Sequence, residues 1–250
     1  MARFNVRDDV SDRAAPILRR AQDEDFGRAA AKSALTLSSS KGEDKVPSLG
    51  DLRFRALLRA EDWAALPEPV RARFSKRLTG GDSVVYTGAV TRTRITRTGK
   101  LFCQLARLIG GPLPLFDDVG IPAIVTVTED GPSGGQVWTR VYARRNGFPQ
   151  VIHSAKRFAG ETGLEEVVGH GVGMALRVSV QDGALLFRSA KYFLQIGAWR
   201  LRLPRVLVPG ALTVTHRELG EGRFLFALDV VHPLFGPFIH QSAIFKDANP

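Results

Sequence analysis

The chain has 250 residues, and 44% of them are hydrophobic, so it is long enough to bury one large core. Lysine and arginine number 35 against 25 aspartate and glutamate residues, which gives a net charge of +10. This excess fits a solvated basic surface or an anionic lipid or ligand, whereas the scattered arginines and the lack of a nucleic-acid-binding motif argue against nucleic acid.

Targeting signals are missing from the sequence. The N-terminus has no apolar run of the ~7–15 residues that a signal peptide needs, and no uncharged apolar stretch reaches the ~18 residues of a membrane-spanning helix. The single cysteine, Cys103, has no partner for an internal disulfide, which fits a reducing compartment. We therefore expect a soluble, cytoplasmic protein.

The first 48 residues differ in composition from the rest. They are low in aromatic residues and include a charged, serine-rich segment at 38–45. Helix formers at 13–37 favour a short helix with a thin apolar face. We expect a flexible tail over 1–48, partly helical, followed by a single β-rich domain over 49–250.

Short helices are expected at the start of the domain. Apolar spacing predicts one helix over 51–58, and Pro69 suits the first turn of a second helix over 70–78. Aromatic residues of this region would plug one end of a barrel: Phe54, Trp63 and Phe74.

Period-two alternation fills most of the chain after Ser83 and predicts about nine strands. They span 83–96, 123–129, 136–145, 149–158, 174–181, 184–196, 211–218, 223–231 and 238–246. The segments that connect consecutive strands are short, as at Asp182-Gly183, so antiparallel pairing of strands that are neighbours in the sequence is expected. The fold class is mainly β: a curved antiparallel sheet or β-barrel, because closure removes exposed strand edges.

One helix interrupts the strands. Leucine and isoleucine at 101, 105, 108 and 109 have the spacing of one apolar helical stripe within 99–110. A strand, a helix and a run of strands over 83–127 also suit a helix-grip sheet. That alternative ranks second because the chain ends in a strand rather than a long helix.

Large apolar residues are expected on the inward faces of the strands. They are Val137, Val141, Met174, Leu176, Val178, Val180, Leu185, Phe187, Leu212, Val214, Phe224, Phe226, Leu228 and Val230. Barrels of about eight strands or more hold either a filled core or one small ligand. Phe224 and Phe226 are therefore candidate ligand-binding residues.

Two histidines are further candidates for ligand-binding residues. His216 shares the parity of Leu212 and Val214, so convergence of His216 and His240 in the barrel interior is one interpretation, and structural or surface histidines are the favoured one. No His-Glu-x-x-His or Cys-x-x-Cys spacing is present, so we expect no metal and no cofactor.

The segment His153-Ser-Ala-Lys-Arg157 combines an imidazole, a hydroxyl and two cations in one expected strand. Alternation places His153 and Arg157 on one face and Ser154 and Lys156 on the other, which disfavours a Ser–His nucleophilic pair. The favoured interpretation of His153 and Arg157 is an exposed strand face; the functional alternative places both in the lumen, where they would bind an anionic or carbonyl group.

Two further segments are expected at a barrel rim. Glu165 and Glu166 precede Gly169-His-Gly-Val-Gly173, which lacks the ending of a phosphate-binding loop and is expected to be a flexible rim loop or a bulge. Aromatic and basic residues further on either contact an anionic membrane surface or seal one barrel end: Trp199, Arg200, Arg202 and Arg205.

Several separated strings resemble one known family. They are DLRFR (51–55), QVWTR (136–140), GFPQVIHSAKRF (147–158), LPRVLVPG (203–210) and HPLFG (232–236). The chain resembles, over roughly 49–247, the bacterial family known as domain of unknown function 4166, in a stand-alone form without a glycine-rich dinucleotide loop. The resemblance implies domain limits and no activity.

Three functions remain open. The leading hypothesis is a lipocalin-like carrier that binds an apolar, amphipathic or anionic small molecule inside the barrel. The second is an isomerase or cyclase that uses the same cavity, with His153 or His216 as acid or base. The third is an interaction or regulatory module with a filled core; the oligomeric state is left open.

Overall fold

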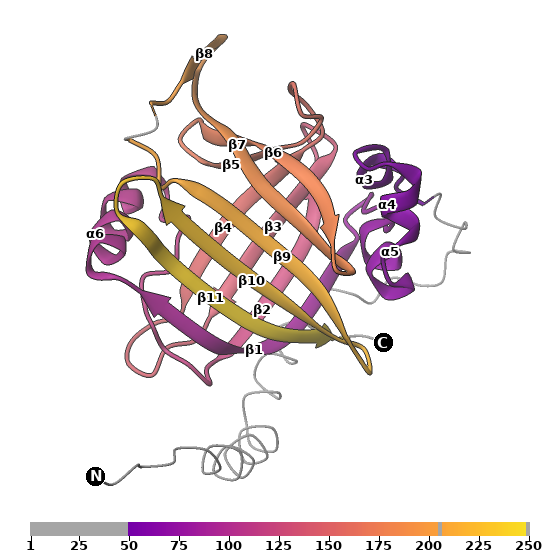
Figure 1. Ribbon diagram of the computed structural model, residues 1–250, viewed down its shortest axis with the longest axis horizontal. Helices are drawn as coiled ribbons and strands as arrows, with labels where there is room; N and C mark the ends of the chain where they lie inside the picture. Colours follow the sequence, from indigo (N-terminus) through magenta and orange to yellow (C-terminus); the bar gives the residue numbers. More distant parts are fainter. Residues whose placement is uncertain (1–49, 205–206, 249–250) are drawn as a thin grey trace, which may run out of the picture. The chain divides into compact units, whose positions relative to one another are not determined.

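The structure is a computed structural model that describes residues 50–204 and 207–248 (Figure 1). The expected tail over 1–48 and the membrane-surface candidate Arg205 lie outside the described residues.

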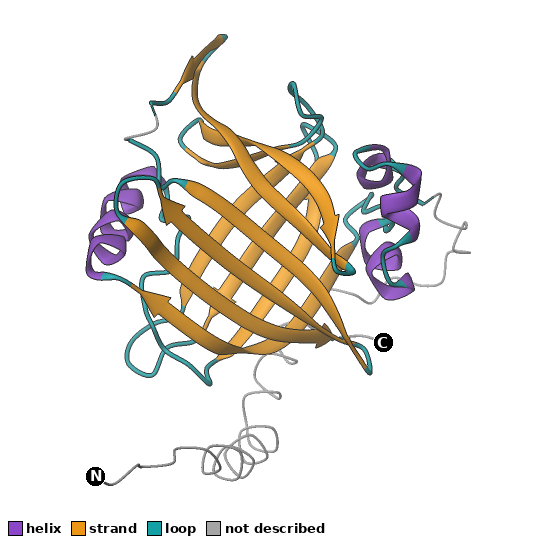
Figure 2. Ribbon diagram, viewed as in Figure 1, coloured by secondary structure: helices purple, strands orange, loops and turns teal. Residues whose placement is uncertain are grey.

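Eleven strands form one antiparallel sheet, and β6 also pairs with β7, so ten of them close into a barrel (Figure 2). The strands are β1 (Ser83–Ile95), β2 (Pro122–Asp130), β3 (Gly135–Tyr142), β4 (Gln150–Arg157), β5 (Glu165–Gly169), β6 (Val172–Gln181), β7 (Ala184–Ile196), β8 (Trp199–Arg202), β9 (Ala211–Gly220), β10 (Arg223–His232) and β11 (Gly236–Asp247). β8 pairs with β7 and lies outside the ring. The expected barrel is confirmed, and closure excludes the helix-grip alternative.

Tight turns join consecutive strands at the predicted places. Asp182 and Gly183 link β6 to β7 with φ of 49° and 69°. Glu221 and Gly222 link β9 to β10 with φ of 55° and 70°. Positive φ at both central residues suits the right-handed twist of the flanking strands. These dipeptides therefore set the register of two hairpins in the barrel wall.

Two strands were not predicted from the sequence. β5 begins with Glu165 and Glu166, whose acidic side chains are buried. Because acidic residues usually lie at exposed positions, the sequence of this segment does not show the apolar alternation of a barrel strand. Of the rim loop or bulge expected over 169–173, only His170 and Gly171 form a turn, because the ends of the segment belong to β5 and β6. The β5–β6 register shifts between Val167 and Gly169, as a bulge would produce. β8 arises because the chain reverses after Ile196 and pairs back onto β7.

Three short helices close one end of the barrel, shown at the right of Figure 1: α3 (Arg53–Ala56), α4 (Ala60–Ala64) and α5 (Glu68–Phe74). Pro69 lies in the first turn of α5, as expected. The rings of Phe54 and Phe74 pack edge to face, with centroids 5.2 Å apart, and both contact Phe187 of β7. The expected aromatic plug is confirmed.

The inserted helix lies at the opposite end (Figure 1) and comprises α6 (Arg97–Leu105) followed by the 3-10 turn η1 (Ala106–Ile109). Its position is confirmed, but the leucines of its apolar stripe are largely exposed, and Leu105 is the one of them that also lines the barrel cavity. Leu101, Leu105 and Leu108 are 64%, 57% and 80% exposed, whereas Gly99 and Cys103 are buried. Gly99 allows the close approach, because a Cβ there would lie 2.4 Å from the carbonyl oxygen of Phe238. Among the described helices, none is long and apolar enough to cross a membrane.

Candidate ligand-binding cavity

A cavity of about 620 Å³ occupies the barrel interior. Its floor includes Phe74 of the plug, and its walls are inward-facing side chains of the strands. At the opposite end it is bounded by α6 and η1 and by the segments 112–114 and 207–209. The cavity therefore runs from the aromatic plug towards the α6 end of the barrel.

Most of the cavity wall is apolar. The expected inward faces of β6, β7, β9 and β10 are confirmed, since their residues belong to the core cluster or pack against it. On β3 the expectation is wrong: Trp138, Arg140 and Tyr142 line the cavity in place of Val137 and Val141. The reversed face brings a guanidinium into the interior.

β4 is reversed in the same way. Ser154 and Lys156 are buried and line the cavity. His153 is exposed on the outer face, where its Nδ1 lies 3.0 Å from Thr139 Oγ1. Arg157 also lies on that face, and its Nε donates to Asp130 Oδ2 at 2.9 Å. The alternation was predicted correctly, and both residues lie on the outer face, as in the favoured interpretation; the alternative that places His153 and Arg157 in the lumen is wrong.

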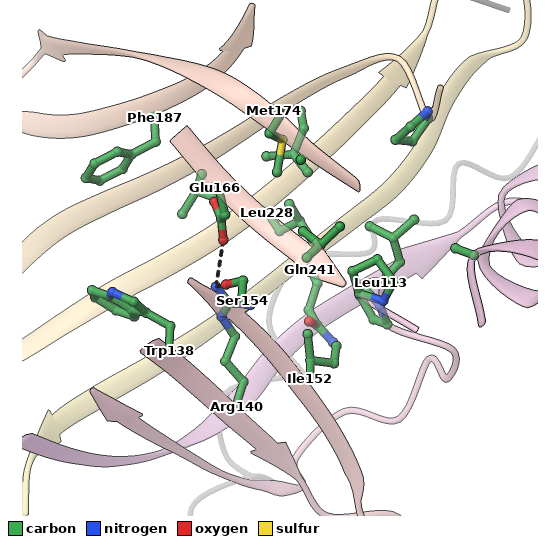
Figure 3. A pocket seen from close by; sticks show the side chains of 18 of the residues that line it. Leu113, Trp138, Arg140, Ile152, Ser154, Glu166, Met174, Phe187, Leu228 and Gln241 are labelled. Carbon is green, nitrogen blue, oxygen red and sulfur yellow. Dashed lines mark hydrogen bonds and ion pairs between the residues drawn. The ribbon is translucent and has the colours of Figure 1, made fainter. Parts of the chain in front are cut away.

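Four polar side chains from three adjacent strands meet on the cavity wall, and we call them the polar cluster: Arg140, Ser154, Lys156 and Glu166. Arg140 Nη2 donates to Ser154 Oγ at 3.1 Å and lies 3.4 Å from Glu166 Oε1 (Figure 3). Lys156 Nζ lies 3.3 Å from Glu166 Oε2. The carboxylate of Glu166 thus bridges the two cations.

Burial and charge together determine the protonation of the cluster. Burial by itself would raise the pKa of Glu166, but Lys156, Arg140 and Ser154 outweigh it and hold that pKa at about 2. Burial lowers the pKa of Lys156, while the charge of Glu166 opposes that shift. Lys156 Nζ also lies 4.9 Å from the Trp138 ring centroid, a geometry that stabilises a cation.

His216 lies in the aromatic core rather than in the cavity wall. It is fully buried, and its ring contacts Phe74, Phe224 and Phe226 at centroid distances of 5.2, 4.9 and 4.8 Å. Neither ring nitrogen has a hydrogen-bond partner among the described residues. Burial, with the nearby charge of Arg73, lowers the pKa of His216 to about 3.

The other residues expected in the interior lie in different environments. Phe226 lines the cavity, whereas Phe224 is fully buried in the core against His216. His240 faces away from the cavity-lining residues of β11, and its Nδ1 lies 2.7 Å from Asp229 Oδ1. His216 and His240 therefore do not converge, and the alternative that brings them together is wrong. Within the described ranges, no group of three or more His, Cys, Asp or Glu is placed to hold a metal ion.

The β7–β8 hairpin projects beyond the barrel wall (Figure 1). Trp199 and Leu201 are 76% and 52% exposed, and Arg202 is also exposed. Arg200 instead binds Glu165 with two hydrogen bonds, of 2.6 and 3.1 Å, and stacks on Phe193. The cavity wall includes Leu203 and residues 207–209, which follow β8, whereas the hairpin itself leaves apolar side chains exposed.

Sequence reasoning missed the polar cluster as a site. The alternation on β4 already placed Ser154 and Lys156 on one face, and Trp138 on β3 shares its parity with Arg140. Choosing the tryptophan instead of the valines as the inward residue would have brought Arg140 inside. Glu166 carried no comparable signal, since β5 itself was not predicted.

Comparison with known proteins gives one match. A family model described as Domain of unknown function (DUF4166) matches residues 66–245. No curated protein and no solved structure matches the chain.

Proposed function

We propose that this chain, which belongs to the family described as Domain of unknown function (DUF4166), binds an apolar or amphipathic small molecule inside its barrel. The cavity of about 620 Å³ is the observation that supports this function. Its size lies within the range of about 300–1,000 Å³ that small-molecule sites occupy, and its wall is mostly apolar with a few polar groups.

The alternatives have less support. A regulatory module with a filled core would leave no space of this size in the barrel. An isomerase or cyclase needs a proton-transfer group that faces the substrate and has a pKa near neutrality. His153 lies on the outer face and His216 lies in the aromatic core, while Glu166 is held ionised. These positions exclude the two histidines, and the ionised state of Glu166 excludes its carboxyl, as that proton-transfer group.

Purified protein offers a direct test of this binding function. Organic extraction followed by mass spectrometry should recover a co-purified apolar compound, and a neutral apolar fluorophore such as N-phenyl-1-naphthylamine should bind and raise the melting temperature. A clean extract together with no fluorophore binding would contradict the proposal.

A cavity-filling variant and a matched control locate the binding site. Ala243 lines the cavity, so Ala243→Phe should abolish fluorophore binding while the protein still unfolds cooperatively. Ala155 lies on the outer face of β4, opposite in parity to Ser154 and Lys156, so Ala155→Phe should leave binding unchanged. Equal binding by both variants would place the fluorophore outside the barrel.

We propose, second, that the α6 end of the barrel contacts an anionic lipid bilayer from which the ligand enters. Exposed apolar side chains lie on α6–η1 and on the β7–β8 hairpin: Leu101, Leu105, Leu108, Ile196, Trp199 and Leu201. Exposed arginines of the same elements supply the complementary charge: Arg97, Arg107 and Arg202. Leu105 also lines the cavity, so this apolar surface is continuous with the proposed binding site.

A further inference from the structure

Inside the apolar cavity, the polar cluster contains more positive than negative groups. Arg140 and Lys156 are two basic side chains, and Glu166 is the one acidic side chain that contacts them. The side chains of Lys156 and Glu166 are each 5% exposed, and that of Arg140 is 22% exposed. A buried excess of charge is costly unless an opposite charge compensates it.

Hydrogen-bond donors also remain available on these cations. Both side-chain contacts of Arg140 use Nη2, so Nε and Nη1 have no acceptor among the described residues. An ammonium group has three donors, and Lys156 contacts a single carboxylate oxygen through Nζ. A guanidinium edge beside an ammonium is an arrangement that suits a carboxylate, because Arg binds carboxylates through paired donors.

We propose that the ligand is an amphipathic monocarboxylic acid whose carboxylate is bound by Arg140 and Lys156 and whose hydrocarbon part fills the apolar cavity. One carboxylate would balance the charge of two cations and one glutamate. The inference rests on the proposed binding function and adds the chemical class of the ligand.

The position of the cluster sets the direction of the bound acid. Lys156 Nζ lies 5.6 Å from the ring centroid of Phe187, which packs against the plug residues Phe54 and Phe74. The carboxylate therefore lies towards the plug. The hydrocarbon extends towards the α6 end, where Leu105 and Leu207 line the cavity.

Glu166 has a defined part in this arrangement. Its carboxylate occupies one donor site of each cation, so it competes with the carboxylate of the ligand. Neutralising Glu166 should strengthen acid binding, whereas removing either cation should weaken it. A cluster that serves only the stability of the barrel would give no such opposite effects on acid binding.

The test uses the full-length protein and three probes with alkyl chains of the same length: dodecanoate, dodecan-1-ol and dodecyltrimethylammonium. Binding of each probe is measured by its displacement of N-phenyl-1-naphthylamine. Dodecanoate should bind about tenfold or more tightly than the alcohol, and the cation should bind weakest. Lys156→Met and Arg140→Met should each bring the acid-to-alcohol ratio close to one. Glu166→Gln should raise it.

Arg157→Met is the matched control, because it removes a cation from the same strand on the outer face. It should leave the acid-to-alcohol ratio unchanged. Equal binding of acid and alcohol by the wild type would overturn the acid assignment and leave the proposed binding function standing. Failure of every probe to bind would overturn the binding function and the acid assignment together. Because the wild-type ratio itself decides the question, a variant that fails to fold does not prevent the test.

Discussion

Lys156 of β4 lies directly opposite Glu166 of β5, and their charged groups approach to 3.3 Å inside the barrel. Both residues belong to antiparallel neighbours, so their side chains project from the same face of the sheet. A buried ion pair of this kind contributes little net stability, because the cost of removing both charges from water offsets their attraction. Its position in the cavity wall is where the proposed carboxylate ligand would bind.

Glu166→Gln should destabilise the protein without ligand. The change leaves the buried Lys156 and the half-buried Arg140 without their shared carboxylate, and breaking a buried pair costs about 3–5 kcal/mol. Urea unfolding should show a lower free energy of unfolding, and added dodecanoate should restore more stability to the variant than to the wild type. Equal stabilisation of both proteins by dodecanoate would show that Glu166 does not compete with the acid.

Acid should destabilise the fold through His216. Its pKa is lowered from 6.5 to about 3 in the folded protein, so the unfolded chain takes up a proton at a higher pH than the folded chain does. The stability that the neutral ring provides is present above pH 6.5 and falls by about 1.4 kcal/mol per pH unit between 6.5 and 3.

His216→Phe should remove that part of the pH dependence. The phenyl ring suits the contacts with Phe74, Phe224 and Phe226 and leaves no unpartnered nitrogen, so the variant should be at least as stable as the wild type at pH 7. Urea midpoints at pH 7 and pH 4.5 measure the difference. His240→Phe, on the outer face, should retain the wild-type loss between the two pH values.

Gly99→Ala should loosen the α6 end of the barrel. A Cβ at Gly99 would lie 2.4 Å from the carbonyl oxygen of Phe238, so α6 must move away from β11, at a cost of about 1–3 kcal/mol. Because α6 bounds the cavity, the bound fluorophore should also dissociate faster in stopped-flow measurements. Thr98→Ala changes an exposed neighbour on the same helix and should alter neither quantity.

The sequence was sufficient for the barrel because its signals are local. Alternation located most strands, and Asp182-Gly183 fixed a turn through its backbone conformation alone. The face that each strand turns inward depends on pairing with distant strands. On β3 the aliphatic Val137 and Val141 resembled core residues, yet neighbouring strands bury Trp138 instead.

The candidate site was harder to predict for the same reason. Because Lys156 and Glu166 are charged, local hydrophobicity favours placing their side chains on the outer face of the barrel. Both are nevertheless stable in the interior, because they pair with each other across β4 and β5. On α6 the opposite occurs, because apolar leucines are largely exposed there. Their spacing correctly indicated a helix, but Gly99 and Cys103 form its buried face because the helix packs closely on β11.

Binding to anionic vesicles should depend on the exposed hairpin. Trp199→Ser with Leu201→Ser removes two apolar side chains that would enter the bilayer interface, so flotation with vesicles of phosphatidylcholine and phosphatidylglycerol should fall several-fold. High salt should weaken wild-type flotation, because the arginines of this surface act through long-range charge. Leu219→Ser is the control, since this exposed leucine adjoins Glu218, which binds Arg73 of the plug helix α5. Salt-independent flotation, or a stable dimer that the double variant abolishes, would show that this surface meets a partner other than an anionic membrane.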